Sequence, residues 1–292
     1  MIVNTLSSLY SKHMLRQLAA AVVVLSALSV YAPASAQERD ALRVCADPNN
    51  LPFSNEGQEG YENKIAELFA QTLGLPLEYT WFPQRRGFIR KTLRSQDPVT
   101  GQYKCDLVMA VPVQFEMGLV TDPYYRSTWA LVFRKDSPLG EIKTPDELFA
   151  LPAETLAGLK IGVFDQTPGA IWLSSHGLLQ QMVGYPTLNA DPAEYPGRVI
   201  ERDLHNKELD GAIVWGPIAG FFVWNDDENL ALLPLRSGNG IRFDFAIAMA
   251  VRYGDKEWRD QVKGLIEQNK DAIDELLRSY HIPLVDENGD PL

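Results

Sequence analysis

The residues of this sequence that could do chemistry are few and widely spaced. General acid–base catalysis needs a histidine or paired carboxylates that converge on a pocket. The histidines are His13, His176, His205 and His281, and no two of them have the spacing of a metal site or of a base and nucleophile couple. Gly-x-Ser-x-Gly and phosphate-loop motifs are also missing from the sequence. We therefore expect no enzyme, no catalytic residue, no metal site and no cofactor.

The two cysteines offer redox chemistry. Cys45 and Cys105 each lie in or beside an apolar, strand-like run. Zinc needs about four ligands, whereas an isolated pair in an oxidising compartment favours a disulfide. Two buried free thiols are the alternative. A disulfide would make the strand at Cys45 and the strand over residues 106–111 neighbours in one sheet.

The N-terminal segment predicts export. Residues 1–36 contain basic residues, an apolar run over 18–30 and Ala-Ser-Ala at 34–36, the three parts of a secretory signal. The apolar run is shorter than the about 20 residues that span a bilayer. We expect a soluble, exported protein that begins at Gln37.

The charge of the chain limits its partners. Removal of residues 1–36 takes away Lys12 and Arg16 and no acidic residue, so the net charge falls from −11 to about −13. This charge disfavours nucleic acid and anionic membrane as partners and favours a basic one. The alternative is that acidity only keeps the exported protein soluble.

Strand and helix patterns alternate along the mature chain, which is typical of an α/β protein. Strands are predicted over residues 43–45, 77–82, 106–111, 128–133, 160–164, 211–215, 230–235 and 243–251. Helices are predicted over 61–73, 87–93, 169–176, 198–206, after Pro217, and over 255–280.

Two long apolar strands, near 128–135 and 242–250, bracket the middle of the chain. The simplest topology has two lobes. The first combines 37–132 with 245–292, and the second, 133–244, is inserted between the crossing strands. A cleft between such lobes is the default ligand or partner site.

The chain in this order resembles the type II periplasmic solute-binding proteins over essentially its whole mature length. More narrowly, it resembles the MxaJ/XoxJ-type accessory proteins of quinoprotein methanol dehydrogenase systems. The narrow resemblance is carried by RVCADPNNLPFS at 43–54, GYENKIA at 60–66 and PQRRGF at 83–88. Three further segments are consistent with it: CDLVM at 105–109, PYYRST at 123–128 and RFDFAI at 242–247.

The resemblance implies a type II α/β fold and a periplasmic protein that assists maturation or activation of a PQQ-dependent methanol dehydrogenase, which uses calcium or a lanthanide. A subunit of that enzyme is the expected partner of a monomeric protein, which clasps an apolar segment of the immature subunit. A small ligand or a peptide segment is expected in the cleft. The alternative function is a receptor of an ABC transporter for a small solute other than an amino acid.

The resemblance also shows what the cleft has lost. Amino-acid-binding members hold the substrate carboxylate with an arginine after the third strand, but residues 112–116 read Pro-Val-Gln-Phe-Glu. Their Gly-Thr pair at the first helix of the second lobe, an anion-binding helix start, is replaced by Gln-Thr-Pro at 166–168. Their amine-binding acidic residue is replaced by Trp-Gly-Pro at 215–217. These changes predict that the cleft does not hold amino acids.

The candidate cleft or partner-binding residues are therefore mainly aromatic, with polar neighbours from the adjacent loops. The aromatic candidates are Phe53, Tyr61, Tyr124, Tyr125, Trp172, Trp215 and Phe243. The polar candidates are Asp47, Asn49, Glu62, Arg85, Arg86, Arg126 and Thr167.

Each group has a structural alternative. Core packing is the alternative for the aromatic residues, most readily for Trp172 and Phe243. Glu62 opens a helix, where an acidic side chain also favours the helix terminus. Arg85 and Arg86 are adjacent and point in different directions, so at most one of them is expected to enter the cleft.

Overall fold

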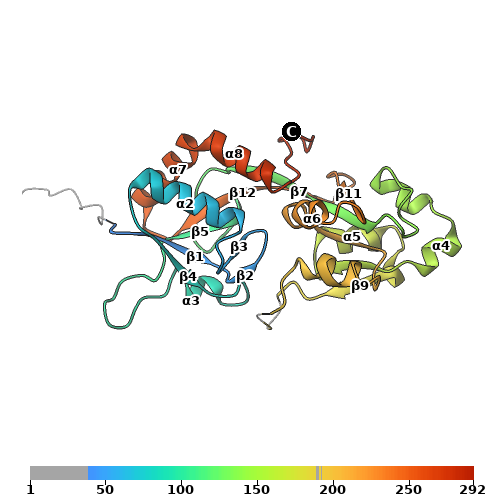
Figure 1. Cartoon of the computed structure of the whole chain (residues 1–292), viewed down its shortest axis with the longest axis horizontal. Helices are drawn as coiled ribbons and strands as arrows, with labels where there is room; N and C mark the ends of the chain where they lie inside the picture. The colour runs from blue at the N-terminus through green and yellow to red at the C-terminus, as the bar shows by residue number, and fades with distance from the viewer. Residues whose placement is uncertain (1–38, 189–190, 192) are drawn as a thin grey trace, which may run out of the picture. The chain divides into compact units, whose positions relative to one another are not determined.

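The computed structural model describes residues 39–188, 191 and 193–292 (Figure 1). Residues 40–292 form one compact unit. The predicted secretory signal lies outside the described residues. No helix within the described ranges has both the length and the apolar character that crossing a bilayer requires.

Among the described residues, a mixed sheet of ten strands organises this unit, and its order along the main path is β4-β1-β5-β12-β7-β10-β8-β9. Strand β6 adds to β12, and β11 adds to β7. The strands are β1 (Leu42–Ala46), β4 (Leu77–Trp81), β5 (Leu107–Pro112), β6 (Leu119–Val120), β7 (Tyr125–Arg134), β8 (Ile161–Phe164), β9 (Met182–Tyr185), β10 (Gly211–Trp215), β11 (Leu230–Pro234) and β12 (Asp244–Val251). A separate hairpin joins β2 (Asn49–Asn50) to β3 (Ser54–Asn55).

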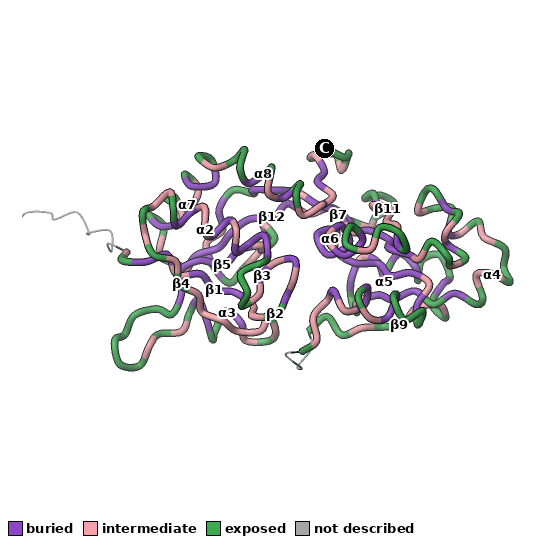
Figure 2. The backbone as a smooth tube through the Cα atoms, in the orientation of Figure 1, coloured by how far each residue is buried: buried purple, intermediate pink, exposed green. Residues whose placement is uncertain are grey.

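The first lobe is built on the parallel strands β4, β1 and β5, with β12 antiparallel to β5. Its helices are α2 (Tyr61–Leu73), α3 (Phe88–Lys91), α7 (Lys256–Gln268) and α8 (Lys270–Ser279). Helix α2 buries Ile65 and Phe69 four residues apart, and it ends at Gly74, whose φ of 66° is the left-handed conformation that glycine adopts without strain. Figure 2 shows the strands of this lobe largely buried and the outer faces of its helices exposed.

The second lobe contains the parallel strands β10, β8 and β9. Its helical segments are η1 (Pro145–Ala150), α4 (Ala153–Gly158), α5 (Pro168–Ser175), η2 (Leu179–Gln181), the π-helix η3 (Val199–Leu204) and α6 (Gly216–Trp224). Two hydrophobic cores fill this lobe, one including Leu131, Ile161 and Ile213 and the other including Val132, Leu204 and Val214. Alternate residues of β7 and of β10 thus face opposite cores, as the period of a strand requires.

Strand β7 belongs to both lobes. Its first residues, Tyr125 to Thr128, pair with β12, and from Trp129 onward it pairs with β10 and from Ala130 also with β11. This arrangement confirms the predicted two-lobed α/β architecture with a segment inserted between crossing strands. The residue boundaries 37–132, 133–244 and 245–292 stay a prediction.

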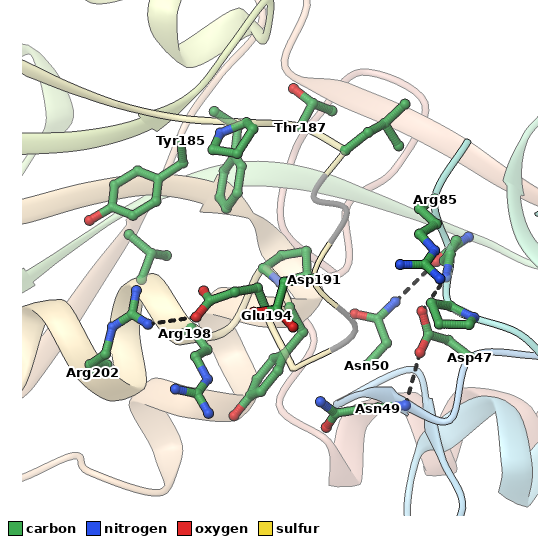
Figure 3. A pocket seen from close by; sticks show the side chains of 18 residues that line it. Asp47, Asn49, Asn50, Arg85, Tyr185, Thr187, Asp191, Glu194, Arg198 and Arg202 are labelled. Atoms are coloured by element: carbon green, nitrogen blue, oxygen red, sulfur yellow. Dashed lines mark hydrogen bonds and ion pairs between the residues drawn. The ribbon is translucent and has the colours of Figure 1, made fainter.

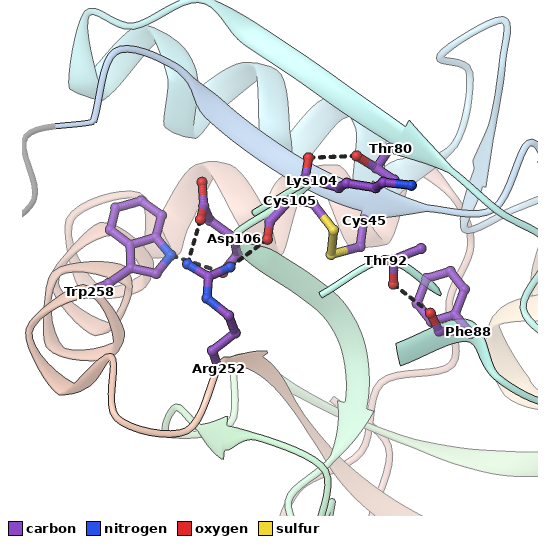
Figure 4. The surroundings of a disulfide bond; sticks show 9 residues. All are labelled: Cys45, Thr80, Phe88, Thr92, Lys104, Cys105, Asp106, Arg252 and Trp258. Atoms are coloured by element: carbon purple, nitrogen blue, oxygen red, sulfur yellow. Dashed lines mark hydrogen bonds and ion pairs between the residues drawn. A yellow bond between two sulfur atoms is a disulfide. The ribbon is translucent and has the colours of Figure 1, made fainter. Parts of the chain in front are cut away.

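The disulfide between Cys45 and Cys105 is confirmed (Figure 4). It joins β1 to the residues that lead into β5, and these two strands are paired neighbours. Arg252, which directly follows β12, binds the residues next to this disulfide. Its guanidinium donates to the carbonyl of Cys105 at 2.6 Å and pairs with Asp106 at 2.6 Å. Trp258 of α7 donates to the Asp106 carbonyl at 3.1 Å, so the disulfide region also anchors the start of the C-terminal helices.

The structure corrects several predicted elements. The single helix expected over 255–280 is two helices that meet at Asn269, whose side chain donates to the carbonyl of Leu265 at 2.8 Å and accepts from Thr72 Oγ1 at 3.2 Å. Asparagine competes for backbone hydrogen bonds in this way and so favours a helix end. Strand β9 was not predicted, and the helix expected over 87–93 is the short α3.

Candidate functional site

Residues at and near the ends of the two end strands of the sheet, β4 and β9, line an open cavity of about 310 Å³, which we call the edge cavity (Figure 3). The first lobe contributes Asp47 after β1, strand β2 and the loop after β4. The second lobe contributes the last residues of β8 and β9, the segment that follows β9, and the start of η3. The lining residues are Asp47, Asn49, Asn50, Pro83, Gln84, Arg85, Phe164, Tyr185, Pro186, Thr187, Leu188, Asp191, Glu194, Tyr195, Pro196, Arg198, Val199 and Arg202.

The first-lobe wall is organised by Asp47. One carboxylate oxygen of Asp47 accepts from the backbone N–H of Asn49 at 2.8 Å, and the other accepts from the backbone N–H of Gln84. Burial raises the pKa of Asp47, although these two hydrogen bonds and the charge of Arg85 oppose the increase. The side-chain amide of Asn50 donates to Gln84 Oε1 at 3.0 Å. The loops after β1 and β4 are therefore fixed to each other.

The second-lobe wall is organised by Arg202. Its guanidinium pairs with Glu194 at 2.8 Å and with Asp203 at 2.6 Å, and the hydroxyl of Tyr185 donates to Asp203 at 2.6 Å. Arg198 places its guanidinium carbon 5.6 Å from the centre of the Tyr195 ring, a cation–π arrangement. This wall thus carries both acidic and basic groups.

A second feature connects the two lobes through aromatic side chains. Phe53 and Trp215 are half-buried, and each packs against the core of the first lobe and against the core formed by Val132, Leu204 and Val214 in the second. The Trp215 ring centre lies 6.1 Å from those of Trp129 and Phe245, in edge-on contacts. We call Phe53 and Trp215 the aromatic bridge.

Tyr61, Tyr124 and Tyr125 are buried in the first lobe, where the hydroxyls of Tyr61 and Tyr125 lie 2.9 Å apart. Glu62 beside them is only 9% exposed, and burial together with the nearby charge of Asp47 raises its pKa to about 8. The cap of α2 is supplied by Asn63, whose Oδ1 accepts from the backbone N–H of Gly60 at 3.1 Å. Glu62 is thus a buried acidic group with a raised pKa.

The structure distributes the predicted polar candidates unevenly. It brings Asp47, Asn49 and Arg85 together in the edge cavity and leaves Arg86 exposed. Thr167 donates to the carbonyl of Phe164 at 2.7 Å and precedes α5, so its hydroxyl is used locally.

Three further candidates serve other contacts. Arg126 pairs with Asp244 across the crossing strands at 2.7 Å. Trp172 and Phe243 are buried, and their ring centres lie 6.1 Å apart in a core of the second lobe. Both also line a separate hollow of about 390 Å³ together with Thr128, Lys143 and Arg236.

Sequence reasoning missed most of the second-lobe wall. Tyr185 ends the unpredicted strand β9, and Asp191 and Glu194 follow in an irregular segment. Arg198 and Arg202 are four residues apart at the predicted helix over 198–206, and this spacing places side chains on one face of a helix. That spacing was the one available signal for a charged site.

Comparison with known proteins places the chain among periplasmic binding proteins. No family model matches the sequence. The chain is 32% identical to the periplasmic binding protein XoxJ from Methylobacterium extorquens AM1, with 85% of this chain and 100% of that chain covered and a TM-score of 0.64.

Two further proteins are similar over most of their length. MxaJ from Methlophaga aminisulfidivorans MPT is 24% identical, with 84% of this chain and 100% of that chain covered and a TM-score of 0.66, which shows the shared fold. Protein MoxJ from Methylorubrum extorquens is 24% identical over 309 residues, which cover 92% of this chain and 96% of that protein.

Proposed function

Because this chain belongs to the MxaJ/XoxJ-type periplasmic binding proteins, we propose that it is a periplasmic accessory protein that assists maturation or activation of a PQQ-dependent methanol dehydrogenase. Its partner is a subunit of that enzyme, and its own role is binding rather than catalysis. The proposal rests on the aromatic bridge, Phe53 and Trp215, which occupies the region between the lobes.

Trp215 carries this proposal because of its position. It ends β10, where amino-acid-binding proteins of this fold carry an acidic residue for the substrate amine, and it packs on Trp129 and Phe245 instead. The loop after β5 contains no arginine, and Thr167 is bonded to its own loop. A region without ionic contacts for a small zwitterion but with partly exposed aromatic surface suits an apolar protein segment.

The proposed mechanism is transient binding of an apolar segment of the immature subunit. Phe53 and Trp215 are half-buried and contact both lobes, so separation of the lobes would expose them together. The bound segment would replace the contacts that the two side chains make with the opposite lobe. An open form of the dehydrogenase would then persist while its cofactor and metal enter.

The test is activation of purified apo-dehydrogenase with PQQ and either Ca²⁺ or La³⁺, with and without this protein. We expect several-fold more active enzyme in its presence. Trp215→Ala should lose most of this effect and should reduce the amount of dehydrogenase retained in a pull-down by about tenfold, a loss of about 1.4 kcal/mol.

Trp224→Ala is the matched control. Trp224 is 57% exposed and is not part of the aromatic bridge. Its ring stacks on that of His281, with the two ring centres 3.6 Å apart. The Trp224→Ala variant should activate the apo-dehydrogenase as well as the parent protein does. Circular dichroism should show that both variants are folded. Equal activation with and without the protein, together with no retained dehydrogenase, would contradict the proposal.

The edge cavity supports a second candidate function, that of a receptor for a small solute. The cavity has polar groups from both lobes and the volume of a small ligand. A receptor would be stabilised by its solute by about 2.7 kcal/mol at 100 times the dissociation constant, whereas the dehydrogenase would not change in activity.

A further inference from the structure

The edge cavity has a balanced set of charges. Its acidic lining residues are Asp47, Asp191 and Glu194, and its basic ones are Arg85, Arg198 and Arg202. Several are already engaged, since Asp47 accepts two backbone hydrogen bonds and Glu194 is paired with Arg202. A ligand with a net charge would therefore meet no uncompensated opposite charge in this cavity.

Engaged carboxylates and guanidiniums still have hydrogen-bonding capacity. Each ionised carboxylate offers about four acceptor positions, and each guanidinium has five N–H donors. A hydroxyl group both donates and accepts, so it can bond to either kind of residue without adding charge. A ligand with several hydroxyl groups would match a lining that carries both acidic and basic side chains.

The side chain of Asn50 offers an unused hydrogen-bond acceptor to the cavity. The residue is 5% exposed, and its amide nitrogen is bonded to Gln84. Its Oδ1 is buried and has no hydrogen-bond partner among the described residues. In Figure 3 this oxygen points toward the middle of the cavity. A buried acceptor of this kind calls for a donor, and a ligand hydroxyl would supply one.

The cavity also has an apolar face. The rings of Phe164 and Tyr185 lie side by side on the second-lobe wall, with their centres 5.8 Å apart. Aromatic rings of this kind pack against the C–H faces of a ligand while its polar groups reach the edges. The volume of about 310 Å³ lies at the lower end of the range for small-molecule sites.

We propose that the edge cavity binds a small, neutral, polyhydroxylated solute of about the size of a monosaccharide. Asn50 Oδ1 accepts from one hydroxyl, Asp47 and Arg198 bond to others from opposite walls, and the ring face rests on Phe164 and Tyr185. This inference rests on the second candidate function, a receptor for a small solute, and names its solute class. It is independent of the accessory role, because the cavity lining includes neither Phe53 nor Trp215, so failure of dehydrogenase activation would leave it standing.

The test uses saturation-transfer NMR and calorimetry with D-glucose, D-xylose and myo-inositol as probes. L-arginine and succinate are the charged comparison compounds. We expect at least one of the three polyols to bind with a Kd of 1 mM or tighter, and both charged compounds to bind at least tenfold more weakly. Arg198→Met and Asn50→Ala should each weaken polyol binding at least tenfold.

Arg90→Met is the matched control, because Arg90 is an exposed arginine of α3 that is not part of the cavity lining. It should bind the polyol as the parent protein does, and thermal melts should show all three variants folded. No binding by any polyol would overturn the proposal. Tighter binding of L-arginine or succinate, or unchanged polyol binding by both cavity variants, would overturn it as well.

Discussion

Arg126 and Asp244 form an ion pair between the two crossing strands, with Nη1 of the arginine 2.7 Å from Oδ2 of the aspartate. Arg126 lies in β7 and Asp244 in β12, within the stretch where these strands pair with each other. Ser237 donates a further hydrogen bond to Asp244. The charged pair therefore fixes the strands at the point where the chain passes from one lobe to the other.

Arg126→Met should destabilise the protein by about 1–3 kcal/mol, because it leaves the carboxylate of Asp244 buried without its cation. Urea unfolding measures the change. Lys207→Met is the control, since Lys207 and its partner Asp136 are 65% and 55% exposed and such a pair contributes less than about 1 kcal/mol. An equal effect of the two substitutions would show that the crossing-strand pair has no special role.

The contribution of the Arg126–Asp244 pair to stability should depend on pH. Burial alone would raise the pKa of Asp244, but the bonds from Ser237 and Arg126 together hold it below its ordinary value of 3.8. The stabilisation is therefore complete above the ordinary value and is lost as the pH falls through the lower folded value. The stability difference between the parent and Arg126→Met should narrow below pH 3.8, as acid titration of unfolding would measure.

The disulfide should contribute strongly to stability. Cys45 and Cys105 are 60 residues apart in sequence, so the cross-link restricts a long loop in the unfolded chain, an effect of about 2–4 kcal/mol. Thermal melts with and without reductant should differ for the parent protein. The double variant Cys45→Ala/Cys105→Ala should melt at the lower temperature in both conditions, and a response of that variant to reductant would exclude the disulfide as the cause.

Glu62 predicts lower stability in alkaline solution. Its pKa rises from 4.5 in the unfolded chain to about 8 in the folded protein, so the protonated form stabilises the fold. This contribution is complete below pH 4.5, declines from there as the unfolded chain ionises, and is lost once the pH has risen through about 8. Glu62→Gln should raise the stability at pH 8.5 by a few kcal/mol relative to the parent.

Glu67→Gln is the control for Glu62, because Glu67 lies on the same helix but is 36% exposed and paired with Lys64. The unfolding free energy of the Glu67→Gln variant should change with pH as that of the parent protein does. If the unfolding free energy of Glu62→Gln still declined between pH 5 and 8 as in the parent protein, the decline would be due to groups other than Glu62.

Gly220 should not tolerate a side chain. A Cβ atom built there would lie 1.9 Å from the backbone carbonyl oxygen of His281, so Gly220→Ala must push the C-terminal segment away from α6 and should cost about 1–3 kcal/mol. Gly264→Ala in α7 is the control, because no described atom outside its own stretch of helix backbone lies within 4 Å of a Cβ built there. That substitution should stabilise the helix by about 0.5–1 kcal/mol, and unfolding of the two variants gives the comparison.

Much of the fold could be predicted because the relevant signals are local. The amphipathic pattern and the glycine after Leu73 predict α2 with the same ends as in the structure. The long apolar strands predicted the crossing of β7 and β12, and the cysteine pair predicted the contact between β1 and β5. The break at Asn269 was missed because the apolar period continues across it, and because one of the two side-chain hydrogen bonds of Asn269 comes from Thr72, far away in sequence.

The candidate site was predicted only in part. The sequence placed Asp47 and Arg85 at strand ends, and both line the edge cavity. Their counterparts Tyr185 and Arg202 come from a short strand and a π-helix one hundred or more residues later, where local pattern does not indicate which wall a side chain will form. Tyr61 and Tyr125 were expected in the cleft, yet their hydroxyls meet each other in the core of the first lobe.

The sequence by itself determined the alternation of strands and helices, the disulfide, the inserted lobe and the absence of an arginine after β5, since each follows from residue type and spacing along the chain. Only the tertiary structure decided which polar groups face each other across the edge cavity, that Phe53 and Trp215 contact both lobes, and that Glu62 is buried. The physical reason is that burial, charge pairing and pKa depend on neighbours brought in by long-range strand pairing, and the periodicity of a segment specifies its buried face but not what that face meets.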